Sequence, residues 1–248
     1  MKSIWNEKYK PLESEILDCI RNFDETGETL YDGRNKIKIF RIGEYILNVK
    51  SFRVPNLVNK VAYKFVRKSK AERSFDYASY LIGKGIGTPE PVACFEEESG
   101  VSFGKSYYVS AHVNYDLTYR ELVQDSEYPD HERILRGFTR FTYGLHENNV
   151  LFLDHSPGNT LIEKRGEDYK YYLVDLNRMK FKELSDTERY KNFSRLTPKE
   201  EMVEIMADEY AKLTGKDPKE VYKQMWYFTN KFQEKYWRKQ RLKQKLKK

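Results

Sequence analysis

The first part of the chain alternates between apolar and polar residues, a pattern that predicts short β-strands. The alternation is clearest at 36–42, where lysine and isoleucine alternate at the start of the segment. Turn-forming residues flank it at 32–35 and at 43–44. We therefore expect antiparallel strands at 28–31, 36–42 and 45–52, followed by two more at 91–95 and 106–110.

Apolar residues spaced three or four apart predict helices in much of the remaining chain, and after Asp175 they predict helices only. Thr197 and Asp217 each precede a proline, and both are expected to cap the start of a helix. Residues 1–26 suit a short amphipathic segment, and 55–70 suits a basic connector or helix. The predicted helices cover 69–81, 118–122, 130–147, 197–213 and about 30 residues from Asp217 onward.

The predicted strands precede the long helices, which indicates an α+β fold with two lobes. A chain of 248 residues is long enough to build two small hydrophobic cores. We expect a small β-rich lobe at 1–110 and a helical lobe at 111–248. Residues 111–115 leave the predicted sheet and are expected to form the hinge between the lobes.

One stretch of the predicted helical lobe carries the candidate chemistry. Residues 150–162 are apolar up to Asp154, turn through Ser-Pro-Gly, reach Asn159 and become apolar again. A polar spacer at 163–168 then leads into a second apolar segment that ends at Asp175. This order predicts a loop, a strand, a hairpin turn and a second strand with an acid at its end.

An Asp, an Asn five residues later and a second Asp after a hairpin are typical of a kinase active site. In that interpretation Asp154 takes the proton of the attacking hydroxyl, and Asn159 and Asp175 hold Mg²⁺. Hard oxygen ligands suit Mg²⁺, which commonly takes only one or two carboxylates from a protein. Each motif alone also fits an ordinary turn, and only the ordered set favours a functional site.

A kinase-like small lobe also needs a lysine for the phosphates and an acid to hold that lysine. Lys50, near the end of the third predicted strand, is the candidate for the α/β phosphates of ATP. Lys38 is the alternative if the register of the strands differs. Glu72 and Asp76 on the predicted helix 69–81 are the two candidate acids, and we favour Glu72.

Composition indicates a globular protein without a membrane-spanning segment. Aromatic residues make up 15% of the chain, and no apolar run reaches the length of a transmembrane helix. The first residues lack the apolar core of a signal peptide, so we expect a cytoplasmic location. Cys19 and Cys94 form no metal-binding motif and are expected to be reduced thiols.

The positive charge is concentrated near residue 248. The net charge is +7, and residues 231–248 alone contain nine Lys or Arg and one Glu. This segment could be a solvated helix end, a contact for anionic lipid or a contact for nucleic acid. Neighbouring aromatic residues favour an anionic membrane surface over nucleic acid. They are Trp226, Tyr227, Phe232, Tyr236 and Trp237.

Together these motifs resemble the lipopolysaccharide core kinases, the family that phosphorylates Kdo or heptose in the inner core. The resemblance covers roughly residues 30–200. The Asp-Xaa-Xaa-Arg motif at Asp175 and the Asn-Phe-Xaa-Arg-Leu motif at Asn192 are similar to this family, whereas protein kinases would show Asp-Phe-Gly. The matching segments are 49–50, 69–75, 85–91, 145–146, 154–159, 174–178 and 192–196.

The resemblance implies a protein-kinase-like fold, ATP as phosphate donor with Mg²⁺, and a sugar hydroxyl as acceptor. It assigns phosphate binding to Lys50, the catalytic base to Asp154, and the metal ligands to Asn159 and Asp175. The expected partner is a lipid-linked acceptor, with Kdo favoured over heptose. The basic C-terminal segment would then hold the enzyme peripherally on the inner face of the inner membrane.

The chain departs from the usual kinase pattern at the first turn of the small lobe. Gly33 stands there without a glycine-rich loop, so Gly33 and Arg34, with Asn35, are the candidates for phosphate contacts at this turn. The helix acid of the family falls at Ser74, so Glu72 or Asp76 would have to replace it. A small-molecule kinase, a protein kinase and a non-catalytic pseudokinase or binding protein remain the alternatives.

Overall fold

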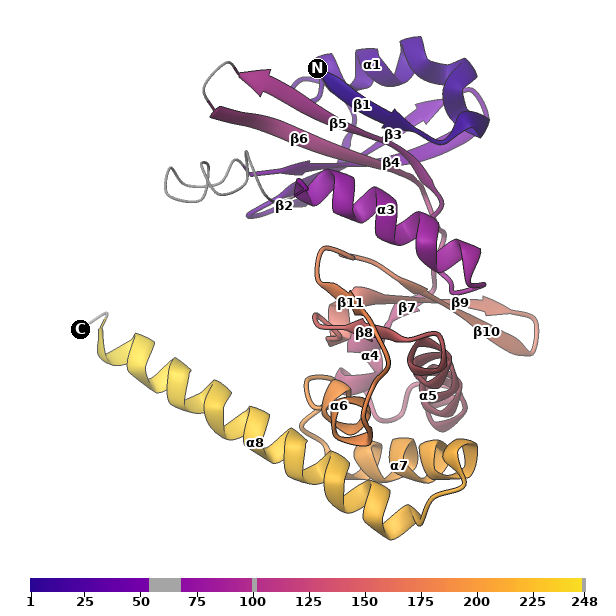
Figure 1. The fold of residues 1–248 in the computed structure, drawn as a ribbon, viewed down its shortest axis with the longest axis vertical. Coiled ribbons are helices and arrows are strands. Elements are labelled where there is room, and N and C mark those ends of the chain that lie inside the picture. The colour runs from indigo at the N-terminus through magenta and orange to yellow at the C-terminus, as the bar shows by residue number, and fades with distance from the viewer. Residues whose placement is uncertain (54–67, 100–101, 247–248) are drawn as a thin grey trace. The chain divides into compact units, whose positions relative to one another are not determined.

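The computed structural model describes residues 1–53, 68–99 and 102–246 (Figure 1). They form two compact units, Met1–Asn114 and Tyr115–Lys248, which we call unit 1 and unit 2. The sequence-based boundary lies at residue 110, and the nucleotide-binding role of the first part stays a prediction. Most of the basic connector predicted at 55–70 lies outside the described residues.

The described residues of unit 1 form a six-stranded antiparallel sheet in the order β1-β5-β6-β4-β3-β2. The five strands predicted from alternation are all present. The sequence pattern missed β1, a four-residue edge strand that pairs with a distant segment and places Ile4 opposite Cys94. The strands are β1 (Lys2–Trp5), β2 (Glu28–Asp32), β3 (Lys36–Ile42), β4 (Tyr45–Phe52), β5 (Pro91–Ser99) and β6 (Ser102–Ala111).

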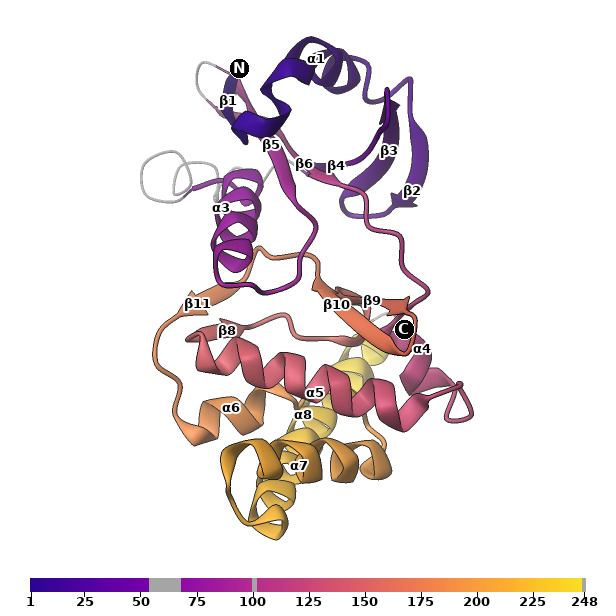
Figure 2. The ribbon, with the colours of Figure 1, turned by 90° about the vertical axis from the view of Figure 1, so that its right-hand side faces the viewer.

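Helices cover both faces of this sheet, α1 (Glu13–Arg21) on one and α3 (Lys70–Gly83) on the other (Figures 1 and 2). Val49 belongs to the core cluster that includes α1, and Phe52 to the cluster that includes α3. Because side chains alternate along a strand, Lys50 lies on the same face as Phe52. The predicted phosphate-binding lysine therefore projects from the face that α3 covers.

The start of α3 follows from its sequence. Ser69 precedes the helix in an extended conformation, and its hydroxyl accepts a hydrogen bond from the Glu72 N–H at 3.0 Å. This bond satisfies one of the N–H groups that a helix start leaves without an intrahelical partner. The helix predicted at 69–81 is thus confirmed, two residues longer at its end.

Lys38, the alternative to Lys50, lies on the opposite face of the sheet and is only 5% exposed. Its ammonium donates to the carbonyl oxygens of Thr26 at 2.7 Å and Asp24 at 3.2 Å, and it lies 5.4 Å from the ring of Phe23. A buried ammonium that is bonded to main-chain carbonyls is structural. Phosphate binding by Lys50, on the other face of the sheet, stays a prediction.

Unit 2 combines short strands at one end with a bundle of helices (Figure 1). Its core is aromatic, with Tyr119, Phe138, Phe193 and Tyr210 almost fully buried. The helices are α4 (Tyr119–Gln124), α5 (His131–Glu147), α6 (Asp186–Asn192), α7 (Glu200–Thr214) and α8 (Pro218–Lys245). The strands are β7 (Leu117–Thr118), β8 (Val150–Phe152), β9 (Thr160–Arg165), β10 (Asp168–Leu173) and β11 (Met179–Phe181).

The expectation that only helices follow Asp175 is wrong. Strand β11 pairs with β8 in an antiparallel register that places Met179 opposite Phe152. Three residues are too few to show a periodic pattern, and their pairing partner lies in a distant part of the sequence. This short ladder matters because it ties the segment after Asp175 to the strand that precedes Asp154.

The two predicted helix caps have different outcomes. The Asp217 carboxylate accepts from the Lys219 N–H at 3.0 Å, and Pro218 takes the first helical position of α8 as predicted. Thr197 does not cap α7, because the helix begins two residues later than expected, after Lys199. The buried Thr197 hydroxyl instead accepts from the Lys199 N–H at 3.0 Å and so forms a local turn before the helix.

Among the described residues, no helix combines the length and apolar character needed to cross a membrane. Even α8, with 28 residues, is interrupted throughout by charged side chains.

The role of Lys38 can be tested by its replacement with alanine. We expect Lys38→Ala to lower the free energy of unfolding by about 1–3 kcal/mol, because the carbonyl oxygens of Asp24 and Thr26 lose their charged donor. Lys36→Ala in the same strand, which removes only a partly exposed ion pair with Asp32, should cost less than about 1 kcal/mol. Urea unfolding of both variants provides the comparison, and equal losses would show that Lys38 has no special structural role.

Candidate active site

The loop after β8 holds Asp154 and Asn159 in fixed relative positions. The side-chain amide of Asn159 donates to the main-chain carbonyl of Asp154 at 2.8 Å, so it closes the loop on itself. A short 3₁₀ helix, Pro157–Asn159, brings Asn159 to the start of β9. Because Nδ2 is the donor in this bond, Oδ1 is the atom of Asn159 that can ligate a cation.

Asn159 is also tied to the segment that carries Asp175. Strands β9 and β10 pair with Thr160 opposite Leu173, and the Val174 N–H continues the ladder by donating to the Asn159 carbonyl at 3.0 Å. Asp175 follows immediately. The hairpin that the sequence predicts therefore places the second Asp next to the Asn in space, although 16 positions separate them in the sequence.

Asp175 adopts a left-handed backbone conformation, with φ of 59°. Such conformations are uncommon for residues other than glycine, cost of order 1–2 kcal/mol, and are tolerated best by Asn and Asp. The Asn177 side chain donates to Asp175 Oδ1 at 2.7 Å and fixes the carboxylate. The unusual backbone aims the carboxylate of Asp175 in a direction that a regular strand would not give.

Two arginines hold the carboxylate of Asp154. Arg195 donates to Asp154 Oδ1 at 3.0 Å and to the Leu153 carbonyl at 2.9 Å, while Arg178 reaches the same Oδ1 at 3.4 Å. The Asp154 side chain is 20% exposed, so a substrate can still reach it. Paired guanidinium groups restrict the orientation of a carboxylate.

The chain that leads into Asp154 is anchored by two further hydrogen bonds. The Leu153 N–H donates to the Arg178 carbonyl at 2.9 Å, and the Asn192 amide donates to the Phe152 carbonyl at 2.8 Å. Asn192 in turn accepts from the buried His146 at 3.1 Å. The last strand residue before the loop is thus held by a side chain of α6 that is itself held by α5.

Tyr210 completes this network. Its hydroxyl lies 2.9 Å from Nδ1 of His146, so a neutral imidazole can accept from Tyr210 and donate to Asn192. Burial lowers the pKa of His146 to about 4, which keeps it neutral near pH 7. The sequence motifs contain His146, Asn192 and Arg195, but reasoning from the sequence assigned them no role, because their bonds join separate helices.

In unit 1, Lys50 lies on β4, whereas the two candidate acids lie on α3. The Lys50 ammonium lies 5.3 Å from the centre of the Phe52 ring. On α3, the mostly buried Glu72 forms ion pairs with Lys2 at 3.4 Å and Lys68 at 3.2 Å. Asp76, the alternative acid, pairs with Lys68 at 2.5 Å. The predicted pairing of an acid on α3 with Lys50 stays a prediction.

Gly33 and Arg34 lie in the exposed turn between β2 and β3. A Cβ atom at Gly33 would come within 2.4 Å of the Tyr31 hydroxyl, so glycine allows the tyrosine ring to lie against this turn. Asn35 accepts a hydrogen bond from the Arg53 N–H at 3.4 Å. The contribution of this turn to phosphate binding stays a prediction.

The oxygen donors of unit 2 fit a cation such as Mg²⁺. Among the residues that the structure describes, no group of three or more His, Cys, Asp or Glu could hold a metal by itself. Asn159 and Asp175 instead offer an amide oxygen and a carboxylate on adjacent, hydrogen-bonded segments. Mg²⁺ commonly binds proteins in this sparse way and completes its coordination with phosphate and water oxygens.

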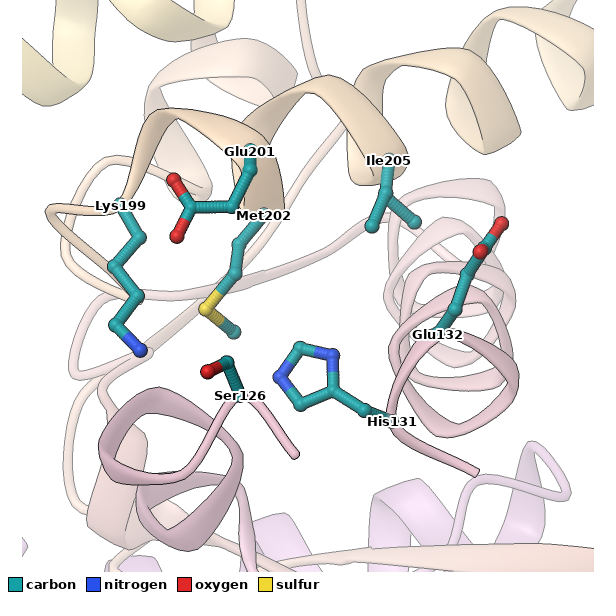
Figure 3. Close-up of a pocket in the computed structure, with 7 residues that line it drawn as sticks. All are labelled: Ser126, His131, Glu132, Lys199, Glu201, Met202 and Ile205. Carbon is teal, nitrogen blue, oxygen red and sulfur yellow. The ribbon is translucent and has the colours of Figure 1, made fainter. Parts of the chain in front are cut away.

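A separate cavity of about 280 Å³ lies where the α4–α5 connection meets the start of α7 (Figure 3). His131 borders it and is fixed by the contact of its Nε2 with the Leu122 carbonyl at 2.9 Å. Its lining does not include Asp154, Asn159 or Asp175. The lining residues are Ser126, His131, Glu132, Lys199, Glu201, Met202 and Ile205.

Comparison with known proteins supports the fold. No protein-family model and no curated protein sequence matches the chain. Many solved structures match, among them one described as WaaP in complex with acyl carrier protein, with a TM-score of 0.65 and 14% sequence identity. The match covers 94% of this chain and 99% of the WaaP chain. The predicted α+β, protein-kinase-like fold is confirmed, and at this identity the likeness shows the fold alone.

The buried histidines predict a pH dependence of stability. Burial lowers the pKa of His155, packed among Phe138, Phe152 and Phe193, to about 3, and that of His146 to about 4. The unfolded chain therefore takes up these protons first, from an ordinary pKa of about 6.5. The free energy of unfolding should be constant above about pH 7 and fall as the pH drops from 6.5 towards 4.

Each histidine should contribute on the order of 1 kcal/mol per pH unit in this window, measured by chemical denaturation at several pH values. The variant His155→Phe, which keeps an aromatic ring in the same pocket, should show a shallower decline. His131→Gln, at a partly exposed position, should keep the wild-type slope. A decline that is unchanged in His155→Phe would contradict the assignment.

Proposed function

We propose that this protein is an ATP-dependent kinase that transfers phosphate to a sugar hydroxyl of the lipopolysaccharide inner core, with Kdo as the acceptor sugar. The observation that carries the proposal is the connected set of Asp154, Asn159 and Asp175, held together through the Asn159 hydrogen bonds. The fold shared with WaaP and the motifs of the lipopolysaccharide core kinases support the same conclusion.

The proposed reaction begins at Asp154. Asp154 accepts the proton of the sugar hydroxyl as its oxygen attacks the γ-phosphorus of ATP. A new oxygen–phosphorus bond forms, the bond to the β–γ bridging oxygen breaks, and ADP leaves. Most of the catalysis is positioning and charge neutralisation, because the transferred phosphoryl group carries its charge on several oxygens.

The residues of unit 2 divide these tasks. Arg195 and Arg178 hold the Asp154 carboxylate in position for the hydroxyl. Asn159 and Asp175 would hold Mg²⁺, which supplies neutralisation of the β- and γ-phosphate charge when it is bound. The left-handed backbone and the Asn177 contact set the direction of the Asp175 carboxylate before any ligand arrives.

The residues of unit 1 bind the donor in this proposal. Lys50 contacts the α/β phosphates, and Glu72 on α3 orients it. Gly33 and Arg34 line the phosphates at the first turn in place of a glycine-rich loop. To orient Lys50, Glu72 would have to give up its ion pairs with Lys2 and Lys68. Because Glu72 is engaged in these pairs, a non-catalytic pseudokinase is the second candidate function. Binding of Mg-ATP separates the two.

The acceptor side of the proposal rests on charge. In its last turns, α8 carries many Lys and Arg side chains. Tyr236 and Trp237 are exposed in the same part of the helix. Basic and aromatic side chains together suit an anionic membrane surface. We propose that the enzyme works in the cytoplasm, peripherally on the inner face of the inner membrane, on a lipid-linked acceptor.

Replacement of Asp175 tests the donor half. Asp175→Asn keeps a residue that tolerates the left-handed conformation, so the fold should survive. Loss of the carboxylate should weaken Mg-ATP binding at least about tenfold and reduce phosphate transfer to Kdo-lipid A at least about hundredfold. Asp168→Asn, at the exposed start of β10, is the matched control and should be near wild type. Equal activity of the two variants would refute the metal-ligand assignment.

Removal of residues 238–248 tests membrane contact, because this segment contains seven Lys or Arg. At about 1 kcal/mol per basic residue near an anionic surface, the truncated protein should bind phosphatidylglycerol vesicles at least about hundredfold more weakly. Neither form should bind phosphatidylcholine vesicles appreciably. Co-sedimentation measures both, and undiminished binding of the truncated form to anionic vesicles would contradict a role of the tail in docking.

A further inference from the structure

The last helix is connected to the loop that carries Asp154 through Arg195. The Arg195 guanidinium, which bonds the Asp154 carboxylate, lies 5.8 Å from the centre of the Phe232 ring on α8. This distance is within the range of a cation–π interaction. The side of α8 that carries Phe232 therefore faces the candidate active site.

Beyond Phe232 the helix continues without cover from the rest of unit 2 (Figure 1). Residues 234–246 are exposed along this part, except for the half-buried Gln240. A helix repeats every 3.6 residues, so positions four, seven and eleven residues after Phe232 lie on the same side. These positions are Tyr236, Lys239 and Lys243.

Tyr236, Lys239 and Lys243 form what we call the inner stripe. Tyr236 continues the contact surface directly, because its ring stacks on that of Phe232 with centroids 6.4 Å apart and an interplanar angle of 25°. At 1.5 Å per residue, Lys243 lies roughly 16 Å along the helix from Phe232. The stripe therefore leads outward from the residue that touches Arg195.

The free end of α8 has basic residues on its other side as well. Arg241 and Lys245 lie about 180° and 140° around the helix from Phe232, given 100° per residue. A purely nonspecific attraction to a charged surface would use both sides alike. The inner stripe begins next to Arg195, which bonds Asp154, so its lysines lie on the side of α8 that faces a molecule whose hydroxyl is bound at Asp154.

We infer that the inner stripe is the binding surface for the anionic groups of the acceptor, the carboxylates and phosphates that flank the sugar to be phosphorylated. This inference rests on the proposed function and adds the residues that select its substrate. The lysine ammonium groups supply charge-assisted hydrogen bonds to these anions, and Tyr236 extends the aromatic surface that Phe232 begins next to Arg195. The stripe binds the acceptor molecule itself, in addition to its share in the general attraction of the tail to anionic lipid.

Two charge-reversed double variants test this assignment. Lys239→Glu with Lys243→Glu changes the inner stripe, and Arg241→Glu with Lys245→Glu makes the same change in charge, at the same spacing, on the other side. Both replacements keep good helix formers. Initial rates are measured with Kdo-lipid A in detergent micelles, where no anionic bilayer is present, and the KM for ATP is measured in parallel.

We expect the inner-stripe variant to raise the KM for Kdo-lipid A on the order of tenfold more than the outer variant does. The KM for ATP should be the same in both, and both should bind anionic vesicles more weakly than wild type. Equal KM values for Kdo-lipid A in the two variants would overturn the inference and leave only general charge attraction. Absence of transfer by the wild type would instead refute the proposed function, so the two failures are distinguishable.

Discussion

The candidate site depends on the hydrogen bonds of one residue, Asn159. Its amide fixes the carbonyl of Asp154, and its own carbonyl receives the N–H that precedes Asp175. Two acids that are 21 positions apart in the sequence thereby become parts of one rigid unit. Because catalysis of phosphoryl transfer is mainly positioning, this double attachment matters as much as the chemistry of the acids themselves.

Arg195 extends this constraint to the periphery of unit 2. It holds Asp154 and the Leu153 carbonyl on one side and contacts Phe232 of α8 on the other. In the core of unit 2, the buried His146 and Asn192 hold β8, the strand that leads into the Asp154 loop. A chain of contacts therefore connects the charged helix α8, the loop that carries Asp154 and the neutral polar network in the core.

The sequence was sufficient for those features that depend on local patterns. Alternation predicted the central strands, and the turn chemistry around Asn159 predicted the loop and hairpin that bring Asp175 near it. The pattern could not reveal β1 or β11, because each is short and stabilised by distant pairing. It also left Lys38 and Lys50 as alternatives, since one residue of register decides which face a side chain takes. Burial gives Lys38 a structural role, and phosphate binding by Lys50 stays a prediction. Arg195 and His146 escaped assignment because their partners lie on other elements.

The most direct test of the central claim is transfer of labelled phosphate from ATP to Kdo-lipid A by the wild-type protein and by Asp154→Asn, at equal concentration and equal thermal stability. The account predicts incorporation into the acceptor with the wild type and at least about a hundredfold lower rate with the variant. Comparable rates in the two proteins would contradict the assignment of Asp154 as the catalytic base. If the wild type binds Mg-ATP but transfers no phosphate, this result would contradict the assignment of Kdo-lipid A as the acceptor.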